Sequence, residues 1–119
     1  MQEPIDVAEQ EEQEAQDRER AKLIAQLVAA DFKWLLSSKR GRRIVWRLLE
    51  DAGVFRSSFT NDPHVTSFNE GRRQYGLKVL AMIHEHSPET YPTMLTEQKD
   101  YERHNSNTSS NGSNGTSNN

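Results

Sequence analysis

The first third of the chain has the clearest hydrophobic pattern. Its large apolar residues recur at steps of three and four, which is the spacing of one helical face. They are Leu23, Ile24, Leu27, Val28, Phe32, Leu35 and Leu36. The pattern predicts a helix from about Asp17 to Leu36. Residues 1–16 are rich in Gln and Glu and nearly without large apolar side chains, so we expect an acidic flexible arm or the solvated start of that helix.

A second apolar stripe follows after two serines. Its members have helical spacing and are Ile44, Val45, Leu48 and Leu49. A serine hydroxyl can satisfy the free amides of a first helical turn, and glycine commonly ends a helix. With Ser37 or Ser38 as the cap and Gly53 as the stop, the sequence predicts a helix over residues 39–52.

The next segment, residues 54–66, has no helical period and is predicted to be a loop held to the core by aromatic side chains. Ser67-Phe68-Asn69-Glu70 then has the capping-box pattern, which places the start of a third helix there. Apolar residues continue at helical spacing to about His86. Gly71 and Gly76 each weaken a helix by about 1 kcal/mol relative to alanine, so we expect them where helices pack closely.

The last segments contribute little to the predicted fold. Ser87-Pro88 is a cap followed by proline at a first helical position, and it predicts a short helical segment through Leu95 that Pro92 can interrupt. Residues 102–119 are mostly Asn, Ser, Thr and Gly, a composition that cannot form a core. We therefore predict a mostly α fold, a small bundle of about three helices over residues 17–101 with disordered termini.

Charge is strongly segregated along the 119 residues. Residues 1–32 carry nine acids against three bases, residues 33–78 carry ten bases against four acids, and the remainder has a net charge of −3. A basic middle between acidic ends predicts that the middle faces an anionic surface, or that the acidic arm folds back and masks it. In a chain with 33% hydrophobic residues the core is also marginal, which favours oligomerisation or docking.

No segment of the sequence indicates export or membrane insertion. There is no cysteine, the amino terminus is acidic where a signal peptide is basic and then apolar, and no apolar run reaches the roughly 20 residues that cross a bilayer. We expect a soluble intracellular protein without disulfides, and we interpret matches to the glycosylation pattern near the carboxyl end as chance.

The candidate binding residues are arginines in two repeated settings. Gly41-Arg42-Arg43 and Gly71-Arg72-Arg73 lie thirty residues apart, each at the head of an amphipathic segment. Arginine is always charged and binds carboxylate or phosphate through a fork of N–H groups, so the triplets predict a partner-binding or phosphate-binding site. Arg47 and Arg56 complete the candidate set. The alternative is that these basic side chains are simply solvated.

Catalysis and metal binding are not indicated. His84 and His86 stand two residues apart, so a helix would point their imidazoles in different directions. Glu50-Asp51 is expected to be a solvated helix end, or a partner for Arg47 or Arg56, rather than an acid/base pair. With no nucleotide-binding glycine loop and no nucleophile elbow, we expect no catalytic residue, metal or cofactor.

The order of these segments resembles one known family. The string from Phe32 to Leu36, the first Gly-Arg-Arg triplet, LLEDAGVFRSSF at residues 48–59 and FNEGRRQYGL at residues 68–77 are similar to the Bordetella-phage-type Bbp nineteen-like phage domain. The resemblance covers about residues 31–98. It implies a protein encoded among the structural genes of tailed bacteriophages, located in the virion or in the host cytoplasm during assembly, with no activity to assign to particular residues.

Three functions are compatible with these features. The first is a non-enzymatic structural or virion-associated phage protein that docks on head, portal or packaged DNA, alone or as a homo-oligomer. The second is a sequence-independent DNA-binding or packaging accessory, because clustered Lys and Arg bind phosphate without reading bases. Trp34 and Trp46 stand beside apolar stripes and are expected in the core or an interface rather than on DNA bases. The third, regulation of a host protein, rests only on the acidic charge of residues 3–19.

Overall fold

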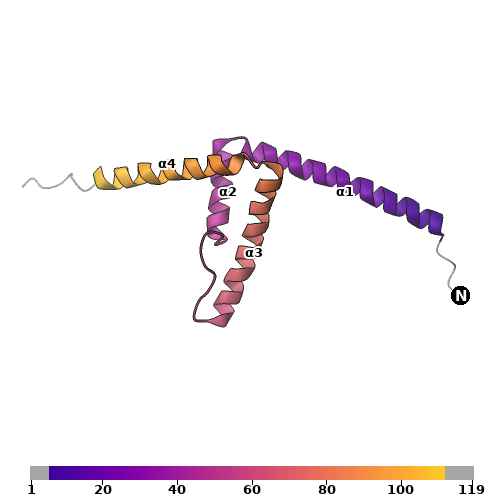
Figure 1. Ribbon diagram of the computed structural model, residues 1–119, viewed down its shortest axis with the longest axis horizontal. Coiled ribbons are helices and arrows are strands. Elements are labelled where there is room, and N and C mark those ends of the chain that lie inside the picture. The colour runs from indigo at the N-terminus through magenta and orange to yellow at the C-terminus, as the bar shows by residue number, and fades with distance from the viewer. Residues whose placement is uncertain (1–5, 112–119) are drawn as a thin grey trace, which may run out of the picture.

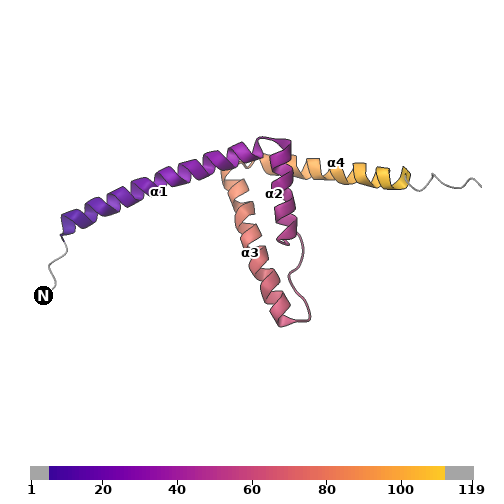
Figure 2. The same ribbon diagram turned by 180° about the vertical axis from the view of Figure 1, so that it is seen from behind.

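The computed structural model describes residues 6–111, and this part of the chain is helical without strands. The elements are α1 (Val7–Leu36), α2 (Lys39–Asp51), α3 (Pro63–His86) and α4 (Thr90–Asn111). α2 and α3 lie side by side below the point where α1 and α4 meet, and α1 and α4 extend from that point in opposite directions (Figure 1). The view from behind shows the same arrangement (Figure 2). The mostly α prediction is confirmed, but residues 6–111 form four helices rather than about three.

Helix α1 begins ten residues before its predicted start. Asp6 caps it, because its Oδ1 atom accepts a hydrogen bond from the Ala8 amide at 3.0 Å. The residues that follow are mainly Ala, Glu and Gln, which have high helix propensity, and their side chains are exposed. Of the two alternatives for the amino-terminal segment, residues 7–16 therefore adopt the solvated helix start, and residues 1–5 lie outside the described part.

Helix α2 has almost the predicted bounds. The Ser38 hydroxyl accepts a hydrogen bond from the Gly41 amide at 3.0 Å. Gly53, with a φ of 80°, lies just beyond the carboxyl end. A positive φ carries little steric cost for glycine, so this residue can end the helix.

The buried face of α2 is rotated relative to the predicted one. Its buried side chains are Val45, Trp46 and Leu49. The stripe pattern also predicts Ile44 and Leu48 there, yet these residues are 48% and 59% exposed. The buried face includes Gly41, which packs so closely on α1 that a Cβ atom would lie 1.8 Å from the Leu35 carbonyl oxygen. This contact turns the Gly41 side of α2, which Val45 and Leu49 share, toward the core. A residue with a Cβ atom does not fit at this position.

Helix α3 begins at Pro63, four residues before the predicted start at Ser67. The Asp62 carboxylate caps it by accepting a hydrogen bond from the amide two positions later, at 2.9 Å. Proline is favourable at a first helical position because no amide donor is needed there. The capping-box prediction is wrong, since the Glu70 carboxylate accepts a hydrogen bond from the Ser58 hydroxyl of the preceding loop instead of bonding back to Ser67.

Helix α4 corrects two predictions. Pro92 stands in its first turn and does not interrupt it, because first-turn amides have no intrahelical partner. The predicted disordered tail, residues 102–119, is helical through Asn111, and the residues beyond lie outside the described part. The Ser106 and Thr108 hydroxyls donate to backbone carbonyls three and four positions back, each at 2.9 Å. Residues 102–111 therefore form a solvated helix, although their composition cannot form a core.

The core is small and lies where the four helices meet. Its buried apolar residues are Leu36, Val45, Trp46, Leu49, Val54, Ile83 and Met94. α1 contributes only its last turns, so most of this long helix lies outside the core. Gly76 brings α3 close to the end of α2, because a Cβ atom there would lie 2.7 Å from Ala52 Cβ. A Cβ atom at Gly71 would have no neighbouring segment within 4 Å among the described residues, so close packing explains only Gly76.

Candidate partner-binding surfaces

The six candidate arginines do not converge on one site. Arg42, Arg43 and Arg47 lie on α2, Arg56 lies in the connection to α3, and Arg72 and Arg73 lie on α3. In each Gly-Arg-Arg triplet, one arginine forms an ion pair with a carboxylate of the chain, at 2.7 Å for Arg42 and 3.9 Å for Arg73, and the other arginine is exposed. The repeated motif thus supplies one contact within the fold and one surface cation each time.

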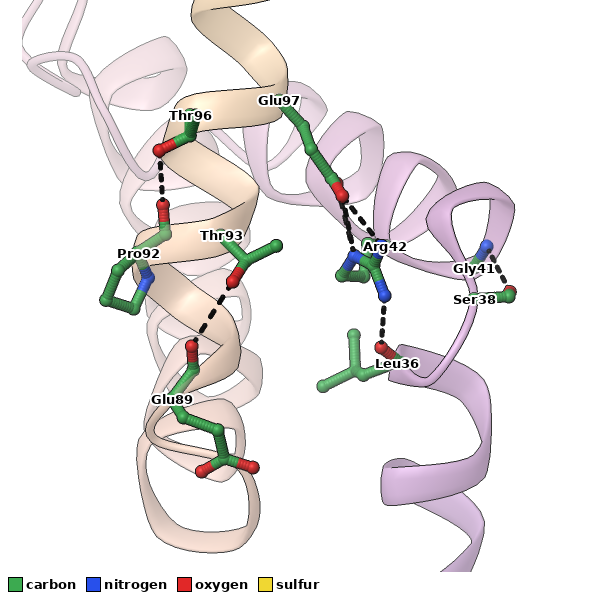
Figure 3. A network of polar contacts seen from close by, with 9 residues as sticks. All are labelled: Leu36, Ser38, Gly41, Arg42, Glu89, Pro92, Thr93, Thr96 and Glu97. Atoms are coloured by element: carbon green, nitrogen blue, oxygen red, sulfur yellow. Dashed lines mark hydrogen bonds and ion pairs between the residues drawn. The ribbon is translucent and has the colours of Figure 1, made fainter.

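Arg42 joins three helices (Figure 3). Its Nε and Nη2 atoms donate to the Glu97 carboxylate, with a shortest distance of 2.7 Å from Nη2 to Oε1. Its Nη1 atom donates to the Leu36 carbonyl oxygen at 3.0 Å, which satisfies an acceptor at the end of α1. Hydrogen bonding to Glu97 raises the pKa of Arg42 above its ordinary value. This arginine is therefore engaged inside the fold, where it ties the start of α2 to α1 and α4.

The exposed cations of α2 form one face, which we call the α2 basic face. It consists of Lys39, Arg40, Arg43 and Arg47. Because helical positions three and four residues apart are neighbours, these side chains leave the helix on one side. Within the part of the chain that the structure describes, Arg43 and Arg47 make no hydrogen bond or ion pair through their side chains. Their guanidinium groups are therefore available to a carboxylate or phosphate surface.

A cavity of about 360 Å³ opens between α2 and α4 beside this face. It is lined by Lys39, Arg42, Arg43, Trp46, Met94, Glu97, Gln98, Asp100, Tyr101 and His104. Trp46, Met94 and Tyr101 supply apolar walls, and Lys39 and Arg43 add cations. An apolar side chain of a partner, with a carboxylate beside it, would complement this combination.

A smaller cavity of about 190 Å³ brings Arg56 and Arg72 together at the far end of α2. Arg56 Nη2 donates to the Glu50 carbonyl oxygen at 3.3 Å. The Arg72 guanidinium carbon lies 5.3 Å from the centre of the exposed Phe68 ring. These two arginines make a second cationic surface, which the spacing of residues along the chain does not indicate.

Arg73 does not line this cavity and lies instead beside Glu70 of the same helix. Its Nη1 atom lies 3.9 Å from Glu70 Oε1, and its Nε atom is buried without a hydrogen-bond partner among the described residues. Hydrogen bonds from the Ser58 hydroxyl and then from Gln74 lower the pKa of Glu70, with a smaller contribution from the Arg73 charge. Arg73 thus lies in a local polar network around the Glu70 carboxylate rather than on an open surface.

The two tryptophans have different environments. Trp46 is 8% exposed, stacks on Phe55 with ring centres 4.8 Å apart, and donates from Nε1 to Glu50 Oε1 at 2.6 Å. The Glu50 carboxylate therefore bonds to Trp46. The sequence predicts a solvated helix end there, or Arg47 or Arg56 as a partner. Trp34 is 77% exposed. Of the two environments expected for the tryptophans, core or interface, Trp46 lies in the core. Trp34 does not, and its place in an interface stays a prediction.

His84 and His86 of α3 lie against different neighbours. The ring centres of His84 and Tyr91 are 5.0 Å apart, and those of His86 and Phe32 are 6.3 Å apart. The two imidazoles therefore point in different directions. Residues 6–111 contain no cluster of three or more His, Asp or Glu side chains able to hold a metal ion. Over the same residues, no helix combines the length and the apolar character that crossing a membrane requires.

Exposed apolar side chains are the feature that sequence reasoning missed. The most exposed aromatic residues are Trp34, Phe59, Phe68 and Tyr75. On α1, the apolar positions Leu23, Ile24, Leu27 and Val28 are exposed as well. Helical period identifies such residues as one face, but the period cannot tell whether another element of the same chain covers that face.

A family model matches the centre of the chain. The model described as Bbp19-like phage protein matches residues 32–96, which confirms the resemblance expected from the sequence. The matched residues contain the whole core and both Gly-Arg-Arg triplets. The exposed part of α1 and the last turns of α4 lie outside the match. No curated protein and no solved structure matches the chain.

Proposed function

Because the chain belongs to the Bbp19-like phage protein family, we propose that it is a non-enzymatic, virion-associated phage protein that docks on a head or portal protein during assembly or ejection. Family membership provides the phage setting, and the docking role is supported by the surface of the chain. Under this proposal the protein is found in the virion, or in the host cytoplasm while particles assemble.

The balance between core and surface carries the proposal. Within the described residues, fifteen large hydrophobic residues are exposed, whereas seven hydrophobic residues form the buried core. Monomeric proteins rarely leave large contiguous apolar areas uncovered. Aromatic residues and arginine are the side chains most enriched in protein interfaces. We therefore expect this chain to gain much of its buried apolar area from a partner.

Two regions combine apolar and cationic groups as a docking site does. The α2 basic face borders the cavity that Trp46 and Tyr101 line, and Arg72 lies over Phe68 beside the smaller cavity. A partner surface with carboxylates next to apolar side chains is complementary to both regions. Such pairing would select one orientation of docking, since the two regions lie at opposite ends of α2.

Quantitative mass spectrometry of purified, nuclease-treated phage particles tests this role. We expect the protein at a fixed ratio to the portal or the major capsid protein. Arg43→Glu and Arg72→Glu reverse exposed charges, so the fold should persist while incorporation falls about tenfold or more. Lys99→Glu changes an exposed cation outside both regions and should incorporate normally. Absence of the protein from the particle, or normal incorporation of both arginine variants, would contradict the proposal.

The α2 basic face also favours a second function, sequence-independent binding of DNA. Each phosphate that a cation neutralises releases counterions, so such binding weakens steeply with salt. We expect a gel shift at about 50 mM salt that is lost by about 200 mM. A double variant with Arg43→Glu and Arg47→Glu should abolish the shift, and Lys99→Glu should preserve it. Lack of binding by the unmodified chain at the lower salt concentration would eliminate this function.

A further inference from the structure

The exposed part of α1 carries a compact apolar surface, which we call the α1 stripe. It consists of Leu23, Ile24, Leu27 and Val28, which are 54%, 54%, 63% and 38% exposed. The four residues follow at helical steps and therefore share one face of α1. α1 extends away from α2, α3 and α4 (Figure 1), so no helix of residues 6–111 covers the stripe.

Two opposite charges flank the α1 stripe on the same face. Arg20 precedes Ile24 by one helical turn, and Asp31 follows Leu27 by one helical turn. Both side chains are exposed, and neither forms an ion pair with another described residue. The order along this face of α1 is therefore a cation, four apolar side chains and an anion.

We propose that the α1 stripe pairs with the same stripe of a second copy of this chain, with the two α1 helices antiparallel. A two-fold axis between residues 25 and 26 places Ile24 opposite Leu27 of the second copy. The same axis places Arg20 opposite Asp31 of the second copy. Because the contact is isologous, every pair occurs twice, and the apolar centre is closed by an ion pair at each end.

Charge favours the antiparallel arrangement over the parallel one. Parallel helices would place Arg20 beside Arg20, Asp31 beside Asp31, and the two acidic segments of residues 9–19 side by side. Like charges at such distances repel. Antiparallel helices form two opposite-charge pairs instead. In this arrangement each acidic segment lies near the end of the other copy's α1, where Lys39 and Arg40 begin α2.

A second copy is also favoured over a lipid surface as the occupant. Helices that lie on membranes carry Lys and Arg on their polar face, which attract anionic lipids. The exposed amino-terminal half of α1 is acidic and would be repelled. The pairing segment, residues 20–31, is about 18 Å long and buries less than the roughly 800 Å² per partner of a standard interface. We therefore expect a reversible dimer that forms at micromolar concentrations.

Sedimentation velocity of the isolated full chain over a concentration series tests the pairing independently of any phage partner. We expect a monomer–dimer equilibrium. Arg20→Asp and Asp31→Arg each place like charges opposite one another and should weaken the dimer about tenfold or more. An equimolar mixture of the two variants regains two opposite-charge pairs and should dimerise like the unmodified chain. Lys33→Glu, on the other side of α1, is the matched control and should dimerise normally.

Three outcomes of this experiment would overturn the proposal. The chain could remain monomeric at every concentration, or it could dimerise with an affinity that neither charge reversal weakens. The mixture could also fail to regain the dimer, which would rule out the antiparallel register. Circular dichroism of each variant is measured alongside, because exposed substitutions should leave the helix content unchanged.

Disulfide trapping tests the register directly, since the chain contains no cysteine. A mixture of Ile24→Cys and Leu27→Cys chains should cross-link efficiently, because these positions face each other across the antiparallel pair. Each variant alone should cross-link poorly, since its cysteine meets the second copy's cysteine at an offset of three residues. Parallel helices would give the reverse result, and that result would overturn the proposal.

Discussion

Arg42 and Glu97 lie 55 residues apart in the chain and form a forked ion pair at the junction of the helices. Two guanidinium nitrogens of Arg42 reach the carboxylate, and the third reaches the Leu36 carbonyl oxygen. One side chain therefore satisfies a helix-terminal acceptor and joins three helices. The pair helps to hold α4 on a core to which this helix contributes Met94.

Replacing Arg42 by lysine should lower the free energy of unfolding by about 1–3 kcal/mol. Lysine keeps the charge but cannot reach both Glu97 oxygens and the Leu36 carbonyl oxygen with one planar group. Unfolding in urea measures the change. Arg47→Lys, which alters an exposed arginine of the same helix, should change stability by less than about 0.5 kcal/mol. Equal effects of the two substitutions would show that the fork is not structural.

Gly76 and Gly71 should respond in opposite ways to replacement by alanine. At Gly76 the new Cβ atom would lie 2.5 Å from Val54 Cγ2 and 2.7 Å from Ala52 Cβ. The end of α2 and α3 must then separate, at a cost of about 1–3 kcal/mol. At Gly71 the Cβ atom has open space, so alanine should stabilise α3 by about 0.5–1 kcal/mol. Thermal denaturation compares the two variants, and stabilisation by Gly76→Ala would contradict the close packing.

Glu70 should make stability depend on pH in the acid range. Hydrogen bonds from Ser58 and then Gln74 hold the pKa of Glu70 below its ordinary value, so folding favours the charged carboxylate. This contribution is complete above the ordinary glutamate pKa, and it is lost as the pH falls through the lower pKa of the folded state. Ser58→Ala should raise the pKa of Glu70 and reduce the loss of stability on acidification.

NMR titration of Glu70, combined with urea unfolding at neutral and acid pH, measures both effects of Ser58→Ala. Ser57→Ala is the matched control, because the Ser57 hydroxyl accepts a hydrogen bond from the Phe59 amide and does not touch Glu70. An unchanged Glu70 titration in Ser58→Ala would show that the hydroxyl is not the cause of the low pKa.

Deleting residues 1–16 should leave the core intact. The described part of this segment is exposed, and Leu36 is the first buried residue of the described part of the chain. At concentrations where the chain is monomeric, the free energy of unfolding should change by less than about 0.5 kcal/mol. The helical circular dichroism signal should still fall, because residues 7–16 are helical. Truncation after residue 96 removes Glu97 and should lower the free energy of unfolding. If both truncations lowered it equally, the amino-terminal segment would be part of the stable fold, contrary to this prediction.

Helix α2 could be located from the sequence because its signals are local. The Ser38 hydroxyl bonds to an amide three positions on, and Gly53 adopts its positive φ directly after the helix. Groups this close in the chain meet whatever the rest of the fold does. The start of α3 was harder to predict because two local caps compete. Asp62 rather than Ser67 caps the helix, because its carboxylate accepts a hydrogen bond from the His64 amide. The Glu70 carboxylate, which a capping box at Ser67 would need, bonds to the Ser58 hydroxyl instead.

Local chemistry was sufficient to predict a helical protein with a basic centre and the bounds of α2. The family came instead from the resemblance of residues 31–98 to known sequences, which the family model confirms over residues 32–96. Tertiary structure alone decided which side chains are engaged. Arg42 and its neighbour Arg43 look equivalent in the sequence, yet only Arg42 meets Glu97. Leu23 to Val28 repeat as a buried face would, yet they are exposed. Period and capping depend on residues a few positions apart, whereas burial and ion pairing depend on distant segments that a local pattern does not encode.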